Sequence, residues 1–151
     1  MKKIILSAAA LMLVVTGFTT TTPDISVKVL EAFSKTFSNT EDLKWYENEN
    51  SYEARFNTDD GIKAIVWYDK DGELLKMTRY YSENKLPPFL LLTLKKKMPE
   101  AKVFGVTEVT NKAGVEYFIT MESEKRWINI KADATGDFEV IDKFRKAATG
   151  L

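Results

Sequence analysis

Residues 52–81, YEARFNTDDGIKAIVWYDKDGELLKMTRYY, decide the fold because they predict three antiparallel strands joined by two tight turns. At the start of this stretch apolar and polar side chains alternate, which is the period of a strand with one buried face. Asp60-Gly61 and Asp71-Gly72 supply the turns, since Asp and Gly accept the positive φ that tight hairpins require. We therefore expect three neighbouring strands, at residues 52–57, 62–69 and 73–81.

A weaker copy of this pattern returns at residues 115–145. Aligning Gly72 with Gly136 also places Asp69 on Asp133, and self-similarity of this kind is typical of duplicated supersecondary units. A further strand is expected at 43–46 in the first unit. The second unit is expected to hold strands at 102–109, 115–122, 126–132 and 137–144.

An apolar stripe precedes each set of strands, and its spacing of three and four residues predicts a helix. Pro23 and Asp24 open the first helix, with Asp24 or Ser26 as its cap, and Leu86-Pro87-Pro88 opens the second. The predicted buried stripes are Val27, Leu30, Phe33 and Phe37 in the first helix, and Leu90, Leu91, Leu94 and Met98 in the second.

Together these elements predict an α+β fold of two tandem helix-plus-four-stranded antiparallel sheet repeats, fused into one domain. Each apolar stripe needs a partner, so the helices should cover one sheet face and leave the other open. The predicted segments are a signal peptide at 1–17, a linker at 18–23, repeat 1 at 24–84, repeat 2 at 85–145 and a tail at 146–151.

The predicted signal peptide has Lys2 and Lys3 ahead of an apolar run at 4–15, then small residues at Val15 and Gly17. This run is shorter than the roughly 20 residues of a membrane-spanning helix. We therefore expect a periplasmic or secreted protein with no stable membrane insertion after the leader is removed. The cleavage position stays open, because the threonines at 19–22 offer alternatives.

Composition excludes several functional classes. The chain has 22 Lys and Arg against 22 Asp and Glu, so we expect no nucleic-acid partner. It has no cysteine and no histidine, which removes thiol chemistry, disulfides, the commonest general base and the commonest zinc ligand. We expect no cofactor and no metal.

The acidic residues do not predict catalysis. Asp69-Lys70-Asp71-Gly72 has the look of a calcium loop, but Leu74 and Leu75 follow where further oxygen ligands would be needed. No spacing brings a carboxylate pair together beside a nucleophile. We therefore expect a protein that is not an enzyme and has no catalytic residue.

Several of these motifs resemble the secreted PepSY-like, β-lactamase-inhibitor-like family. The resemblance covers about residues 24–145 and implies a helix-plus-four-strand architecture, export from the cytoplasm, and an inhibitor or other binding role without catalytic residues. The motifs that carry it are Phe37-Ser38-Asn39, Lys44-Trp45, residues 52–56 and 68–72, Leu86-Pro87, residues 98–101 and residues 133–136.

Strand alternation also predicts which side chains lie on the face away from the helices. Large aromatic rings among cations are typical of protein interfaces, although such rings also pack on one another as a minor second core. The candidate partner-binding residues are Tyr46, Arg55, Lys63, Ile65, Trp67, Phe118, Trp127, Asn129 and Lys131.

Three functional hypotheses follow. The first is an exported module that binds an unknown protein or peptide through this aromatic face, as an inhibitor or otherwise. The second is a periplasmic sensor or carrier of a small ligand or peptide, with a pocket between the repeats. The third is a hydrolase that depends on carboxylates.

Overall fold

The computed structural model describes residues 23–147, so the predicted signal peptide and the end of the tail lie outside the described residues. The predicted helices and strands are present in the predicted order, with ends that move by a few residues. They are α1 (Val27–Thr36), β1 (Glu41–Glu47), β2 (Ser51–Asn57), β3 (Lys63–Asp69), β4 (Leu74–Tyr81), the short 3-10 helix η1 (Glu83–Lys85), α2 (Pro88–Lys97), β5 (Lys102–Asn111), β6 (Gly114–Glu122), β7 (Arg126–Asp133) and β8 (Phe138–Arg145).

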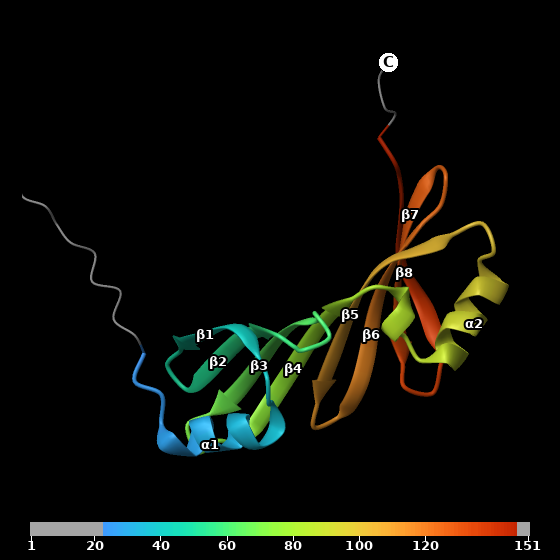
Figure 1. The fold of residues 1–151 in the computed structure, drawn as a ribbon. Coiled ribbons are helices and arrows are strands. Elements are labelled where there is room, and N and C mark those ends of the chain that lie inside the picture. Colours follow the sequence, from blue (N-terminus) through green and yellow to red (C-terminus); the bar gives the residue numbers. More distant parts are fainter. Residues whose placement is uncertain (1–22, 148–151) are drawn as a thin grey trace, which may run out of the picture.

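All eight strands form one antiparallel sheet in the order β1 to β8 (Figure 1). The α+β class holds, but the prediction of two tandem four-stranded repeats is wrong. Strand β4 pairs with β5 from Lys76↔Asn111 to Tyr81↔Val106, which makes the two halves a single sheet. The pairing satisfies the backbone groups of β4 that would otherwise form a bare sheet edge.

Both helices cover the same face of this sheet. Val66 packs in the core beneath α1, and Ile130 packs in the core beneath α2. Directly opposed residues share a face, and an unbroken line of opposed pairs joins the two cores. That line runs through Ala64, Arg79, Glu108, Tyr117 and Ala132.

In α1 only the second half of the predicted stripe is confirmed, because Phe33 is buried and Phe37 packs against the core. Val27 is 70% exposed and Leu30 is also exposed, whereas Val29 and Phe33 are buried against the sheet. The helix starts at Val27 with Ser26 as its cap, so Val27 lies in the first turn. In α2 the predicted stripe is confirmed, with Leu90 and Leu94 buried and Leu91 and Met98 packed beside them.

A hairpin turn holds the start of α1. The Asp69 carboxylate accepts the backbone N–H groups of Asp71 and Glu73, at 2.9 and 2.8 Å, which fixes the turn between β3 and β4. Gly72 has a φ of 87°, and a Cβ there would lie 2.9 Å from the Lys28 carbonyl oxygen, so the close approach requires glycine. The carboxylate is therefore engaged in the turn rather than in a calcium loop.

Between the two cores, the helix-covered face carries an ion pair between the half-buried Arg79 and the buried Glu108. Glu108 is 6% exposed and accepts bonds from Arg79 Nε and Nη2, at 3.0 and 2.6 Å. The Tyr81 hydroxyl donates to the other oxygen of Glu108 at 2.6 Å. Burial, and then this bond, raise the pKa of Tyr81. The network fills the junction of β4 and β5 with satisfied polar groups.

Leu94→Ala is expected to lower the free energy of unfolding by about 3 kcal/mol, because it leaves a cavity beneath α2. Leu92 lies in the same helix and is 68% exposed, so Leu92→Ala should change it by less than about 0.5 kcal/mol. Urea denaturation of both variants measures the difference. Equal decreases in the free energy of unfolding for the two variants would mean that α2 does not pack its Leu94 side against the sheet.

The burial of Tyr68 predicts that the free energy of unfolding decreases at alkaline pH. Burial raises the pKa of its phenol to about 12 from an ordinary value of 10.0, so the unfolded chain loses the proton first. The free energy of unfolding should therefore be fully retained below pH 10 and fall between about pH 10 and 12. Between pH 9 and pH 11, Tyr68→Phe should reduce that fall by roughly 1 kcal/mol.

Urea denaturation at pH 9 and pH 11 measures this fall. The exposed Tyr46 gives the matched control, since Tyr46→Phe should leave the fall unchanged. An unchanged pH dependence in Tyr68→Phe would contradict the burial of this hydroxyl.

Candidate functional site

The sheet face opposite the two helices, called here the open face, carries all nine side chains that the sequence predicted for partner binding. The strand register shows this placement. Directly paired residues of neighbouring strands share a sheet face, and none of the nine is paired with a residue of the two cores. Tyr46, Arg55, Lys63, Ile65 and Trp67 lie on β1 to β3, and Phe118, Trp127, Asn129 and Lys131 lie on β6 and β7.

In the first half of the open face, Glu53 organises the aromatic rings. Its carboxylate is only 8% exposed and accepts a bond from the Trp67 indole N–H at 2.9 Å. The other oxygen accepts Arg55 Nε, and this bond raises the pKa of Arg55. Arg55 lies 4.7 Å from the centre of the Tyr46 ring, and the Lys76 ammonium lies 3.9 Å from that of Trp67. Both cations therefore stack on rings that a buried carboxylate helps to orient.

Beside this network lies a shallow hollow of about 320 Å³. Three cations border it, Lys44, Arg55 and Lys63, with one carboxylate, Asp42. Tyr46 and Tyr80 flank the cations, and both rings are exposed. The hollow is accordingly basic, with aromatic walls.

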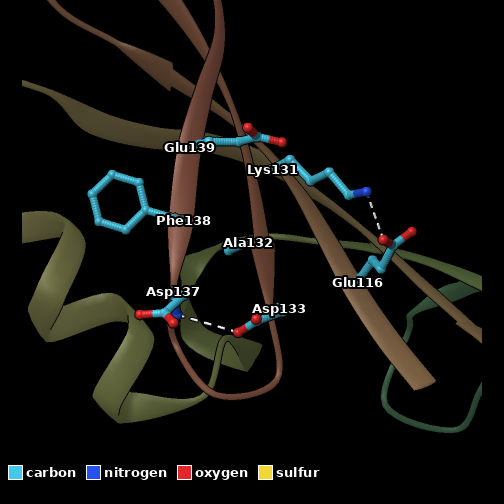
Figure 2. A pocket seen from close by; sticks show the side chains of 7 residues that line it. All are labelled: Glu116, Lys131, Ala132, Asp133, Asp137, Phe138 and Glu139. Carbon is cyan, nitrogen blue, oxygen red and sulfur yellow. Dashed lines mark hydrogen bonds and ion pairs between the residues drawn. The ribbon is translucent and has the colours of Figure 1, made fainter. Parts of the chain in front are cut away.

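The other half of the open face has a hollow of the opposite charge, about 380 Å³ in volume. Figure 2 shows the Lys131 side chain extending toward Glu116, and the ion pair measures 2.6 Å. The hydrogen bond to Glu116 raises the pKa of Lys131. Four carboxylates and one ammonium group line this hollow, whose residues are Glu116, Lys131, Ala132, Asp133, Asp137, Phe138 and Glu139.

A cluster of rings lies on the open face near the C-terminal end of the sheet. Phe104 is 64% exposed and packs edge-on against Trp127, with ring centres 4.9 Å apart. Phe144 is exposed as well and is directly opposed to Trp127. The Lys146 ammonium lies 5.0 Å from the centre of the Trp127 ring. Trp67 and Trp127 are thus partly covered, but neither is buried in a core.

Sequence reasoning missed four members of this surface. Phe104 lies within an irregularity in strand pairing and Phe144 follows another, and there strict alternation assigns the wrong face. Tyr80 was left out because the facing of its strand was ambiguous. Glu53 was missed because a polar position on an alternating strand gives no sign of burial, although its register opposite Trp67 would have indicated the bond.

Residues 23–147 contain neither a cluster of possible metal ligands nor a helix that could span a membrane. Within residues 23–147 no three Asp or Glu side chains lie close enough together to hold a metal ion. In the same range, neither helix is both long and apolar enough to cross a membrane. What the open face does offer is stacked rings, cations and two oppositely charged hollows.

Comparison with known proteins identifies the fold. No protein-family model matches the chain, and no curated protein matches it. Among solved structures, a BLIP-like protein from Bacteroides fragilis is 20% identical with a TM-score of 0.59, covering 83% of this chain and 91% of its own. A DUF2874 family protein from Bacteroides uniformis is 19% identical with a TM-score of 0.58, covering 80% and 88%.

A Bacteroides eggerthii protein with a provisional periplasmic name is also 19% identical, with a TM-score of 0.58, and covers 82% of this chain and 88% of its own. These similarities support the β-lactamase-inhibitor-like part of the predicted resemblance at the level of fold. They do not single out the PepSY-like part. The chain therefore has a BLIP-like fold.

Glu53→Ala is expected to lower the free energy of unfolding by about 2 kcal/mol, because it leaves the Trp67 indole and Arg55 without their shared acceptor. Trp67 should also become more accessible to a fluorescence quencher. The matched control is Glu139→Ala, which removes an exposed carboxylate from the same face and should have little effect. Equal effects of the two substitutions would show that Glu53 does not hold the ring.

Proposed function

We propose that this protein is an exported binding module that engages another protein through its open face. The observation that carries the proposal is the set of partly exposed rings held on this face by Glu53 and by stacked cations. Tyr, Trp, Phe and Arg are the residues enriched in protein interfaces. Rings that are already oriented lose little conformational entropy when a partner covers them.

The two most buried carboxylates support binding rather than catalysis. Glu53 and Glu108 are the buried acidic residues of the described chain, and each accepts bonds from an arginine. A general base needs a free carboxylate within reach of a substrate proton. Both groups are instead used to fix neighbouring side chains, so they serve as parts of the scaffold.

Export is supported from two directions. The first residues of the sequence have the charge and apolar pattern of a secretory leader. One protein of the same fold carries a provisional periplasmic name. The partner would therefore be met in the periplasm or outside the cell.

Replacing both Trp67 and Trp127 with Ala is expected to abolish capture of the partner from the native envelope fraction, since large rings provide most of the energy at such interfaces. The matched control is Val27→Ala with Leu92→Ala, which truncates two exposed side chains on the helix-covered side. The measurement is affinity capture with each variant, after circular dichroism shows that it folds. Unchanged capture by the folded tryptophan variant would refute the proposal.

A further inference from the structure

One row of side chains crosses the open face from β1 to β7 and has opposite charges at its two ends. Directly opposed pairs give the row in order: Lys44, Arg55, Ile65, Thr78, Val109, Glu116 and Asp133. Two cations occupy the first two places, two carboxylates the last two, and uncharged side chains the middle three. The charge pattern is thus reversed about Thr78 on the central strand β4.

The charged ends keep atoms that can bind a partner. Within residues 23–147, Arg55 contacts Glu53 through Nε, so its terminal nitrogens remain for another acceptor. Glu116 binds Lys131 through one oxygen, and Asp133 uses Oδ1 for its turn. The turn bonds, first that from the Thr135 hydroxyl, lower the pKa of Asp133 and keep the carboxylate charged.

A row with this charge pattern complements a second copy of itself. If a two-fold axis lies between two open faces and runs parallel to β4, Lys44 meets Asp133 of the other copy and Arg55 meets Glu116. Ile65 then meets Val109, and the axis passes over Thr78, which is already buried within each copy. An axis along the row instead would place Lys44 on Lys44, so the charges select the first arrangement.

We propose that the open face binds a second copy of this chain, forming a symmetric face-to-face dimer about an axis parallel to β4. This proposal rests on the proposed function and names the partner. An isologous interface must be self-complementary, and this row satisfies that requirement. The apolar residues Ile65 and Val109 flank its centre and charges lie at its rim, as in other protein interfaces.

The face is large enough for such a dimer. Six strand spacings of about 4.8 Å give the row a length of about 29 Å, and strands of about seven residues are roughly 23 Å long. The product is on the order of 650 Å² per copy, or about 1,300 Å² in total, which is within the range of specific interfaces. Sheets packed with their strands nearly aligned are also a common arrangement.

Sedimentation equilibrium of the exported protein tests the proposal. The expected result is a concentration-dependent dimer at 50 mM NaCl that weakens at 500 mM, because partly exposed ion pairs are screened by salt. A chain that stays monomeric up to millimolar concentration at both salt concentrations would overturn the proposal.

Charge reversal then tests the arrangement. Lys44→Glu alone and Asp133→Lys alone should each weaken the dimer by about tenfold, because each puts like charges together at two symmetric places. An equimolar mixture of the two variants should dimerise as well as the unchanged chain, since every contact is again between opposite charges. Lys96→Glu, on α2, is the matched control and should have no effect.

Asp133 also anchors a turn, so Glu116→Lys provides a second acidic-end variant that leaves this turn intact and should weaken the dimer as well. A dimer that survives all three open-face variants would place the interface elsewhere and overturn the proposal. If the chain is monomeric but the tryptophan variant still loses capture of an envelope protein, the proposed function stands and only the self-association fails.

Discussion

The backbone pairing of β4 with β5 is the constraint on which the rest of the structure depends. Each half alone would be a four-stranded sheet with one helix, and each would have a bare edge at β4 or β5. Pairing the two edges removes both, and it aligns the two open faces into one surface. The Arg79–Glu108 pair lies at this junction on the helix-covered side, with Glu108 buried beside Tyr117 of the core beneath α2.

That continuous surface explains how a protein with few chemical groups for catalysis can still have a defined site. The open face does not depend on a deep cavity, since both of its hollows are shallow and open. Under the proposed function, binding would depend on rings that are fixed before a partner arrives. Glu53 holds Trp67 through the indole N–H from the neighbouring strand, and cations stack on Tyr46 and Trp67. Because the sheet is continuous, the cations at one end and the carboxylates at the other lie on one surface. That surface therefore has a positive end and a negative end.

Much of this could be predicted from sequence because alternation and turn chemistry are local signals. The strands, both helices and the facing of residues such as Lys63 and Lys131 follow from spacing and from the Asp-Gly turns. The pairing of β4 with β5 could not be predicted in this way. Two strands separated by a helix look the same in sequence whether they pair or lie in separate sheets. The first half of the α1 stripe was misassigned for a related reason, since Val27 and Val29 are equally apolar and only their packing against the sheet distinguishes them.

The candidate site, too, was predictable where the signal is local and unpredictable where it depends on pairing between strands. Side chains in regular strands were assigned correctly to the open face, whereas Phe104 and Phe144 lie beyond irregularities in pairing that break the period of two. The burial of Glu53 depends on its neighbours across the sheet and not on its own strand. The identity of the partner depends also on the partner's own surface. This sequence describes that surface only if the partner is a second copy of the same chain.

Hydroxyl-radical footprinting tests the central claim most directly, by comparing the protein in dilute solution with the protein in its native envelope fraction. We expect the open-face rings Tyr80, Phe104 and Trp127 to become protected in the envelope fraction, while Phe89 and Leu92 on α2 react equally in both. Open-face rings that react as strongly in the envelope fraction as in dilute solution would contradict the claim that a protein covers this face.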